Sequence, residues 1–314
     1  MERQLRETGQ DQVSTTDPDA RQLIIRGDIA EVAYNAQTTV DSKHNLVIDT
    51  KVINTNDRKI LSTMGLQAKE ILNKDSFELL ADKGYHNGEE LLKCDLMNIK
   101  TYVAPQENIS GNKIPTSEYQ GDKFRYNSED DCYICPEGQT LRSNGRCYKK
   151  FYRTHITLVK QYKTKACREC PKRCWCTSSP IERGRLIERS QYQDAVDANN
   201  LRVRNEKKKY RHRQTMVEHP FGVVKRQWGY DHVMMKGLEK TDSEISLVFL
   251  CYNIKRVMNI MGINGILRAI KAFSQSFSPC LSCFIHIFTF YTPSYFQLNP
   301  ILQNRASIIQ FSRC

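Results

Sequence analysis

The sequence predicts an α/β protein whose strands and helices are interrupted by a cysteine-rich insertion. Two short runs of strand character are followed by apolar positions at helical spacing, and a brief apolar run then ends at Asp82. This alternation of strands and helices is typical of an α/β core. A length of 314 residues, a hydrophobic content of 39% and a mean hydropathy of −0.58 indicate a soluble, core-forming chain of one large domain or two modest ones.

The first elements form a hairpin followed by a helix. Residues 33–40 and 46–53 have strand character, and the polar stretch 41–45 between them is a short connection that favours an antiparallel hairpin. Residues 54–57 then supply side chains suited to cap a helix. The helical spacing that follows is carried by Ile60, Leu61, Met64, Ala68, Ile71 and Leu72.

A second strand and helix pair completes the first part of the core. Residues 77–81 form a short apolar run that ends at Asp82, and Gly84 permits a tight turn. Residues 89–97 have helical composition, and a strand is expected around 101–103.

Composition divides the remainder of the chain. Residues 241–244 form a capping box that begins a mostly buried helix over 245–261, with Gly262 as its C-cap. The expected organisation is a polar lead-in (1–30), the first part of the core (31–104), a cysteine-rich insertion (105–200), a helical part that contains Glu218 (201–265) and an unassigned apolar tail (266–314). The tail has almost no charge, and we give it two interpretations: read-through from a damaged reading frame, or a hydrophobic tail that makes the protein sticky.

The charge balance favours a polyanionic partner. Lys and Arg number 47 against 35 Asp and Glu, which gives a formal net charge of +12. Nucleic acid and an anionic membrane surface both fit such a charge, but a dense basic run over 202–213 favours nucleic acid. The polar N-terminus has no secretory signal, so a cytoplasmic location is expected. Residues 280–295 are apolar but too short and interrupted to span a membrane.

Two carboxylates carry the chemical interpretation. Asp82 follows a strand, and Glu218 begins a basic, amphipathic segment. Two such acids could meet at a divalent metal, which phosphodiester cutting and joining require. The alternatives are structural: Asp82 as an ordinary turn residue, and Glu218 as a helix-start carboxylate with Pro220 in the first turn.

Several motifs, in order along the chain, resemble those of the DDE transposases of bacterial insertion sequences. They are Ala-Tyr-Asn-Ala-Gln at 33–37, Val-Asp-Ser-Lys-His at 40–44, Ala-Asp-Lys-Gly-Tyr at 81–85, Val-Glu-His-Pro-Phe-Gly at 217–222 and Tyr-Asn-Ile-Lys-Arg at 252–256. The resemblance covers roughly residues 10–265.

The resemblance implies a fold and a metal site. The fold is an RNase H-like mixed-sheet core, with the cysteine-rich segment as an insertion and a helical C-terminal part. In this family three acids hold two Mg²⁺ ions, for which Mn²⁺ can substitute. Asp82 matches the second acid and Glu218 the glutamate. Tyr210, Arg213 and Lys225 match residues that accompany the glutamate, although Arg213 is one residue further from it than in the usual signature.

The basic run beside Glu218 is interpreted as a DNA-binding surface rather than a merely solvated face. The expected partner is double-stranded DNA at the ends of an insertion element, with a homodimer as an open possibility and no membrane. Trp228 and Tyr230 could stack on a base or pack in the core. The predicted DNA-binding residues are Lys207, Lys208, Lys209, Tyr210, Arg211, Arg213, Lys225 and Arg226.

The first family acid has no clear counterpart. In the family it lies on a core strand upstream of the hairpin, and no strand is predicted there. Asp17 and Asp19 belong to a turn-like linker, and Asp41 is expected to be a solvated residue at the hairpin tip. We therefore infer that the chain is an N-terminally truncated transposase that begins after this acid.

The cysteines form a second constellation. Cys-x-x-Cys pairs begin at Cys132 and Cys167, and Cys174-x-Cys176 follows, which is enough thiolates for a tetrahedral Zn²⁺ site that would stabilise an insertion without a core. Unligated, reduced thiols are the alternative. The resemblance implies the set Cys135, Cys167, Cys170 and Cys176, and leaves Cys132, Cys147 and Cys174 as spares.

Three functions remain open at this stage. The leading hypothesis is a DDE transposase that binds element ends and catalyses Mg²⁺-dependent strand cleavage and transfer, incomplete because its first acid is missing. The alternative is a non-catalytic, zinc-containing DNA-binding remnant. A thiol-redox protein is the third and weakest, because no Cys-x-x-Cys lies in a thioredoxin-like strand and helix.

Overall fold

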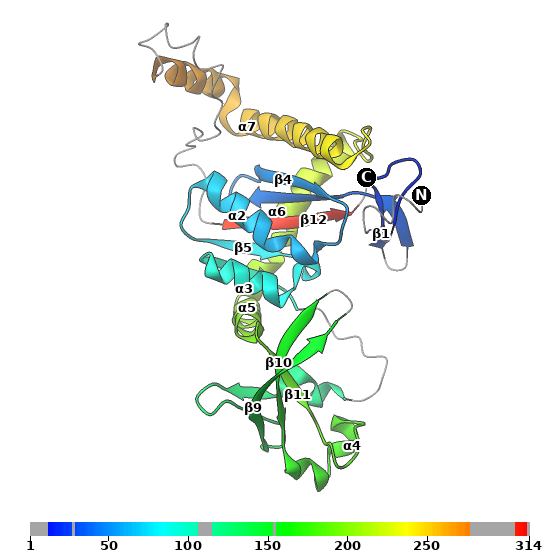
Figure 1. The fold of residues 1–314 in the computed structure, drawn as a ribbon. Coiled ribbons are helices and arrows are strands. Elements are labelled where there is room, and N and C mark those ends of the chain that lie inside the picture. The colour runs from blue at the N-terminus through cyan, green and yellow to red at the C-terminus, as the bar shows by residue number, and fades with distance from the viewer. Residues whose placement is uncertain (1–11, 27–28, 106–114, 153–154, 277–304, 313–314) are drawn as a thin grey trace. The chain divides into compact units, whose positions relative to one another are not determined.

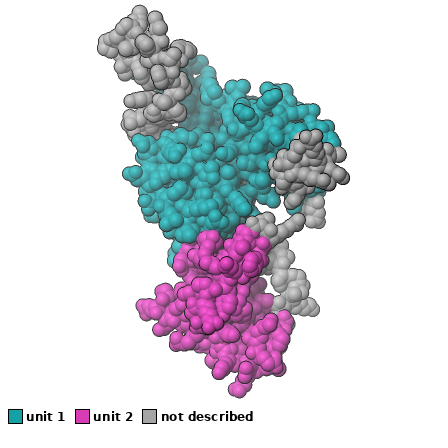
Figure 2. Space-filling model, viewed as in Figure 1, with its two compact units in different colours: residues 1–105, 198–314 teal, residues 106–197 magenta. Residues whose placement is uncertain are grey.

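The computed structural model describes residues 12–26, 29–105, 115–152, 155–276 and 305–312, and the chain divides into two compact units. Unit 1 comprises residues 1–105 and 198–314, and unit 2 comprises residues 106–197 (Figure 2). Among the described residues, no helix combines the length and the apolar character needed to cross a bilayer. The apolar stretch 280–295 lies outside the described residues.

Unit 1 is built on a mixed sheet in the order β4-β3-β12-β5-β6 (Figure 1). β3 (Asn35–Asp41) and β4 (Val47–Ile53) form the predicted antiparallel hairpin. β5 (Phe77–Ala81) and β6 (Ile99–Val103) are parallel. β12 (Arg305–Ser312) lies between the two pairs, antiparallel to β3 and parallel to β5. The predicted α/β class and mixed sheet are therefore confirmed.

The helices that connect these strands follow the predicted spacing. α2 (Leu61–Leu72) buries Leu61, Met64 and Ala68 completely, and its end at Asn73 adopts the left-handed conformation that Asn tolerates. The Asn87 side chain accepts a hydrogen bond from the backbone of Glu89 at the start of α3. The elements here are η1 (Asp57–Lys59), η2 (Lys83–Tyr85) and α3 (Gly88–Leu96).

The C-terminal part of unit 1 is mainly helical. α5 (Gln193–Asn205) precedes α6 (Lys207–Phe221), which continues into a π-helical segment, η6 (Gly222–Gln227). α7 (Leu238–Ser276) is interrupted at Gly262, where φ is 67°. Gly262 therefore breaks the helix as predicted, but the helix resumes beyond it. The segment 266–314, expected to be an unassigned tail, begins in α7 and ends in β12.

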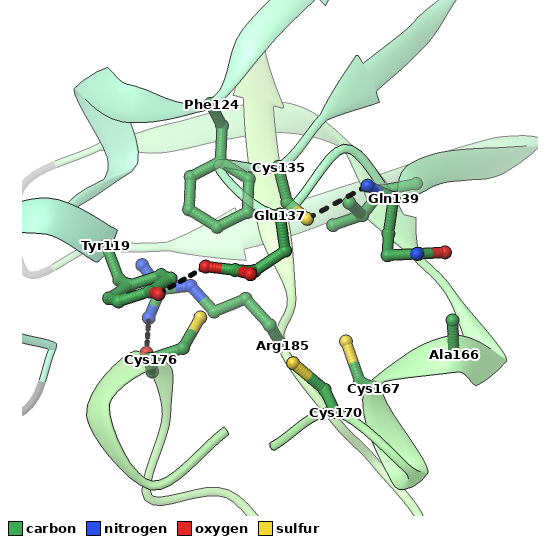
Figure 3. A pocket seen from close by; sticks show the side chains of 11 residues that line it. Tyr119, Phe124, Cys135, Glu137, Gln139, Ala166, Cys167, Cys170, Cys176 and Arg185 are labelled. Atoms are coloured by element: carbon green, nitrogen blue, oxygen red, sulfur yellow. Dashed lines mark hydrogen bonds between the residues drawn. The ribbon is translucent and has the colours of Figure 1, made fainter. Parts of the chain in front are cut away.

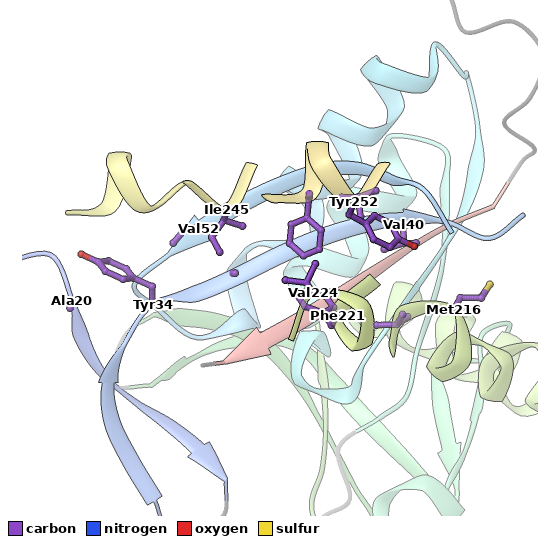
Figure 4. Close-up of a cluster of buried hydrophobic side chains, with 13 residues drawn as sticks. Ala20, Tyr34, Val40, Val52, Met216, Phe221, Val224, Ile245 and Tyr252 are labelled. Atoms are coloured by element: carbon purple, nitrogen blue, oxygen red, sulfur yellow. The ribbon is translucent and has the colours of Figure 1, made fainter. Parts of the chain in front are cut away.

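α6 and α7 share one hydrophobic core with the hairpin (Figure 4). The rings of Phe221 on α6 and Phe249 on α7 meet edge to face, with centroids 5.2 Å apart. Each buried side chain of this size contributes about 1.5–3 kcal/mol to folding. The core comprises Tyr34, Ala36, Val40, Val47 and Val52 with Met216, Val217, Phe221, Val224, Ile245, Phe249 and Tyr252, and Ala20 at its edge.

The N-terminal segment is more ordered than the sequence indicated. β1 (Arg21–Arg26) and β2 (Ile29–Ala33) form an antiparallel pair, so the predicted polar lead-in over 1–30 is wrong from Arg21 onward. The turn before β1 is anchored, because Asp17 accepts hydrogen bonds from the Tyr34 hydroxyl (2.7 Å) and from the backbone of Gly237 (3.2 Å).

Unit 2 contains an antiparallel sheet in the order β11-β10-β9-β8-β7. Its small core of Phe124, Tyr133, Leu141, Tyr162 and Ile187 corrects our expectation of an insertion without a core. The elements are η3 (Ser117–Tyr119), η4 (Gly121–Lys123), β7 (Arg125–Asn127), β8 (Cys132–Ile134), β9 (Thr140–Phe151), β10 (Ile156–Lys163), η5 (Lys165–Arg168), α4 (Arg173–Cys176) and β11 (Ile187–Ser190).

One carboxylate links the strands of unit 2. Asp131 accepts hydrogen bonds from the hydroxyls of Tyr162 (2.6 Å) and Tyr126 (2.8 Å) and pairs with Lys160 at 3.0 Å. These interactions lower the pKa of Asp131 to about 2, and the hydrogen bond from Tyr162 has the largest effect. The ionised carboxylate therefore stabilises the fold of unit 2 at neutral pH.

We predict that Asp131→Asn lowers the thermal midpoint of the protein at pH 7. A depressed carboxylate pKa stabilises the folded state above the unfolded value of 3.8, and this contribution is lost as the pH falls toward about 2. The difference in midpoint between variant and wild type should therefore narrow below pH 4, measured by circular dichroism across a pH series. Glu129→Gln, at an exposed neighbouring residue, is the control. A difference that stays constant with pH would refute this role for Asp131.

Candidate metal and DNA site

Asp82 lies where β5 ends and η2 begins. Its carboxylate accepts a hydrogen bond from the backbone of Lys83 at 2.7 Å, and 43% of its side chain is exposed. The turn after it is anchored by Tyr85, which is fully buried and donates a hydrogen bond to Gln37 on β3. The carboxylate is therefore held at a strand end but remains open to a ligand.

α6 meets this strand end through two residues that the resemblance groups with Glu218. Arg213 approaches the Asp82 carboxylate at 3.5 Å, and the Tyr210 hydroxyl donates to the carbonyl of Ala81 at 3.2 Å. Burial raises the pKa of Tyr210, so its hydroxyl stays protonated at neutral pH. The Nε atom of Arg213 is buried and has no hydrogen-bond partner in the described part of the chain. The guanidinium therefore keeps donor capacity beside Asp82.

Glu218 lies on the same helix, five residues beyond Arg213. At 1.5 Å per residue this is a rise of about 7.5 Å along the helix axis. The side chain is exposed, and Gln214 donates a hydrogen bond to it at 2.7 Å. Among the residues that the structure describes, no group of three or more His, Cys, Asp or Glu side chains could hold a metal ion. The structure thus places Asp82 beside the helix of Glu218 without assembling a closed metal site.

The helix around Glu218 departs from the sequence-based expectation. Glu218 and Pro220 lie inside α6, near its end, so the alternative of a helix-start carboxylate is wrong. Pro220 has no N–H to donate to the preceding turn, and the π-helical segment η6 begins two residues after it, at Gly222. Because π-helical turns are wider, Lys225 is rotated relative to Glu218 compared with an ideal α-helix.

The predicted basic surface is divided by the structure. Lys207, Lys208 and Arg211 on α6 are exposed, as is Arg226 on η6. Lys209 is only 12% exposed, and its amino group contacts Glu78 at 2.7 Å and Glu206 at 2.8 Å. Lys209 therefore joins α6 to β5 and is poorly placed to contact DNA.

Each candidate for the first acid is engaged elsewhere. Asp17 is bound as described above, and Asp19 accepts from the backbone of Leu238 at 3.0 Å, so both acids attach the N-terminal turn to the start of α7. Asp41 was expected to be solvated but is 1% exposed, and it accepts from the backbone of His44 at 2.7 Å. Burial raises the pKa of Asp41. None of the three approaches Asp82 through a hydrogen bond that the structure describes.

β12 occupies the strand position next to β5, which we had expected the chain not to supply. Ser307 pairs with Leu80 on β5, so the position two residues on, Ile309, is level with Asp82. Ile309 also pairs with Thr38 on β3, whose hydroxyl is buried without a hydrogen-bond partner in the described residues. Residues 305–312 contain no Asp or Glu. The strand beside Asp82 is therefore present, but it carries no acid.

The motif at 252–256 has a structural role. The Tyr252 hydroxyl donates to the carbonyl of Asn45 at 2.7 Å, and the Arg256 side chain donates to the carbonyl of His44 at 2.7 Å. The Asn253 side chain bonds both the N–H (2.8 Å) and the C=O (2.7 Å) of Val47. These contacts attach α7 to the hairpin connection, which explains Tyr252, Asn253 and Arg256 of the motif without a catalytic role.

Four cysteines line one pocket of unit 2 (Figure 3). They are Cys135, Cys167, Cys170 and Cys176, the set that the resemblance implies. Burial raises the pKa of Cys176, and its interactions with the other three thiols raise it further. Of the spare cysteines, Cys132 is buried while Cys147 and Cys174 are exposed, and none of them lines this pocket. The fold thus brings Cys135 to the same pocket as three cysteines that follow it much later in the sequence, although the described side chains, these included, form no group of three or more that could hold a metal ion.

Two neighbouring groups and a glycine shape the surroundings of these thiols. The backbone N–H of Gln139 donates to the sulfur of Cys135 at 3.2 Å, in a tight turn where Gly138 has a φ of 78°. Arg185 also lines the pocket, and its positive charge opposes the rise in the Cys176 pKa. Gly184 has a φ of 63°, and a Cβ there would lie 2.9 Å from that of Cys167. The glycine therefore allows the loop to pass close to this cysteine.

Two features of the site were not predicted. Gln214 binds Glu218 from four residues earlier, a spacing that places side chains on one helix face and could have been recognised. β12 lies more than two hundred residues from its partners, and only an alternation of residue types in an apolar tail could have indicated it.

The comparisons with known proteins match the part of the chain that contains Glu218 and the pocket cysteines. Residues 134–258 match a family model described as a transposase DDE domain. The matched segment contains the four pocket cysteines, Glu218 and the motif at 252–256, whereas Asp82 lies upstream of it. The searches of curated proteins and of solved structures return no match.

Proposed function

Because residues 134–258 match a family model described as a transposase DDE domain, we propose that the chain is a DDE-type transposase that binds insertion-element ends in double-stranded DNA and is built for strand cleavage and transfer. Divalent metal ions are the general cofactors of such domains, and Mg²⁺ or Mn²⁺ would serve here. The contact of Tyr210 and Arg213 with the strand end at Ala81 and Asp82 carries this proposal, because it joins the upstream acid to the matched segment.

The proposed core is RNase H-like. In support, an antiparallel hairpin and a parallel strand pair flank one central strand, and helices lie on both faces of this mixed sheet (Figure 1). Asp82 follows the strand next to the central one, and α6 crosses the sheet beside it. These are the positions from which the family's second and third acids would converge.

In this proposal Asp82 and Glu218 ligate the metal through their oxygen atoms, the donors that Mg²⁺ prefers. When bound, the metal would activate a water or a DNA 3′-hydroxyl and stabilise the leaving oxygen. Arg213 and Tyr210 would hold a phosphate beside Asp82, and Lys225 on η6 would contact DNA further along the helix. The exposed Lys207, Lys208, Arg211 and Arg226 would contact other phosphates without reading sequence.

We propose that the site lacks its first acid. An acid on the central strand β12 that ligated the same metal ion as Asp82 would have to be level with Asp82. The residue at that position is Ile309. Two carboxylates hold a divalent ion less firmly than three. The wild-type chain should therefore bind DNA but nick it weakly.

We predict that Ile309→Asp raises Mg²⁺-dependent nicking of a duplex with cut ends, because it adds a carboxylate level with Asp82. Ile308→Asp is the matched control, since adjacent strand residues face opposite sides of a sheet. Nicking should be measured on a labelled duplex with Mg²⁺ and with Mn²⁺.

Either substitution could destabilise the sheet, so circular dichroism must show that both variants fold. Asp82→Ala or Glu218→Ala, introduced into the wild type and into Ile309→Asp, should abolish any nicking that is present. Nicking that survives these changes contradicts the assignment of the two acids. DNA binding without nicking in every folded variant, with either metal, would favour the non-catalytic alternative.

A specific observation supports the zinc-containing part of that alternative. The four pocket cysteines in unit 2 supply the ligand set of a structural Zn²⁺ site. The N–H of Gln139 and the nearby Arg185 would stabilise thiolate charge. Such a site would stabilise unit 2, whether or not unit 1 is catalytic.

We predict that the purified protein contains about one zinc per chain, because four Cys ligands bind Zn²⁺ tightly. Metal content should be measured by mass spectrometry, together with the thermal midpoint before and after chelation. Cys167→Ser should lose the metal, whereas Cys174→Ser, outside the pocket, should retain it. Absence of zinc after refolding in its presence, with a midpoint that chelation leaves unchanged, would rule out the site.

A further inference from the structure

The ribbon formed by β9 and β10 in unit 2 is strongly basic. Residues 140–163 contain seven Lys and Arg and no Asp or Glu. This run is separate from the basic run on α6, and its concentration of charge was not singled out in the sequence.

Part of this charge is neutralised within unit 2. Lys150 pairs with Glu188 on β11, and Lys160 pairs with Asp131 at 3.0 Å. The exposed cations Arg142, Arg146, Lys149 and Lys163 form no ion pair in the described part of the chain. The ribbon therefore carries an uncompensated positive surface.

The strand register places two of these cations directly opposite each other. Arg142 on β9 pairs with Lys163 on β10, and both side chains are exposed. Like charges in this arrangement destabilise a sheet, unless an anion lies between them. The pairing therefore indicates an anionic ligand rather than a contribution to folding.

A bulge in β9 adds a third cation. Cys147 pairs with Lys160 and Ser143 with Tyr162, so β9 contains two more residues than β10 over this interval. Gly145 has a φ of 77°, and the side chain of Asn144 accepts from the backbone of Arg146 at 3.1 Å. Bulges of this kind redirect side chains, and here the exposed Arg146 lies within the bulge.

Apolar side chains accompany the charges. Phe151 is 71% exposed and Ile156, its cross-strand partner, is 55% exposed. Leu158 is 40% exposed opposite Lys149. A surface that served only to keep the protein in solution would not expose these residues beside the cations.

The cations occupy both faces of the ribbon. Lys163 and Leu158 on β10 are five residues apart, so Arg142 and Lys163 lie on the opposite face from Lys149. A groove of duplex DNA has a phosphate row on each side, and the major groove, about 12 Å wide, admits a two-stranded ribbon. A polyanion with one charged face would not match this distribution.

We propose that the β9–β10 ribbon enters a groove of double-stranded DNA. Arg142 and Lys163 contact one phosphate row, Lys149 the other, and Phe151 and Ile156 contact the groove between them, while Arg146 extends the contact from the bulge. The proposal rests on the proposed function only in taking DNA as the ligand.

The test measures the salt dependence of duplex binding by the full-length chain, using fluorescence anisotropy of a labelled duplex. Arg146→Gln with Lys149→Gln should lower the slope of log K against log salt by about 1.8 and weaken binding at 0.1 M salt by roughly tenfold or more. Lys59→Gln with Lys74→Gln removes the same charge from exposed positions of unit 1 and should leave the slope unchanged.

Two results would overturn the proposal. One is a ribbon variant, Arg146→Gln with Lys149→Gln, that binds duplex DNA like the unit 1 control. The other is a loss of binding confined to single-stranded DNA, which would exclude groove insertion. Lys207→Gln with Lys208→Gln separates the ribbon from the proposed function. If this pair weakens DNA binding and the ribbon pair does not, only the ribbon inference fails. If neither pair weakens DNA binding, the proposed DNA-binding function fails too.

Discussion

The packing of α6 across the sheet is the constraint on which the candidate site depends. Met216, Val217 and Phe221 on this helix are buried in the core shared with the hairpin and α7. Their burial fixes the rotation of α6, so that Arg213 reaches Asp82 while Glu218 stays exposed. The Lys209 contact with Glu78 holds the start of the same helix to β5. Buried residues of α6 thus stabilise the fold, whereas other residues of the same helix form the candidate site.

The elements predicted best are those defined by short-range patterns. The hairpin, α2, β5 and α3 lie where alternation, helical spacing and capping side chains indicated them. β12 was missed because its partners on β3 and β5 are remote in sequence, and such pairings leave no local signal. The burial of Lys209 was missed for a similar reason, since its partner Glu78 is 131 residues away. A run of basic residues does not reveal which of its members finds a counter-charge.

The site was predicted unevenly. Asp82 and Glu218 were identified from their sequence context and the four pocket cysteines through a family resemblance, and the fold brings the cysteines to one pocket and Asp82 to α6. The resemblance did not indicate that the central strand position would be filled by residues 305–312, which lack an acid. The fold of this core therefore does not require an acid on that strand, although metal-dependent chemistry would. This difference explains how a well-packed sheet and the incomplete metal site that we propose can coexist in one chain.

The central claim, that Asp82 and Glu218 share one cation, is tested most directly by Mn²⁺ binding. Electron paramagnetic resonance should be used to measure the dissociation constant of the wild type, Asp82→Asn, Glu218→Gln and the double variant. Residues that ligate one ion are energetically coupled, so we expect each single change to weaken binding almost as much as both together. Free energies that add independently, or binding that neither change affects, would contradict the account.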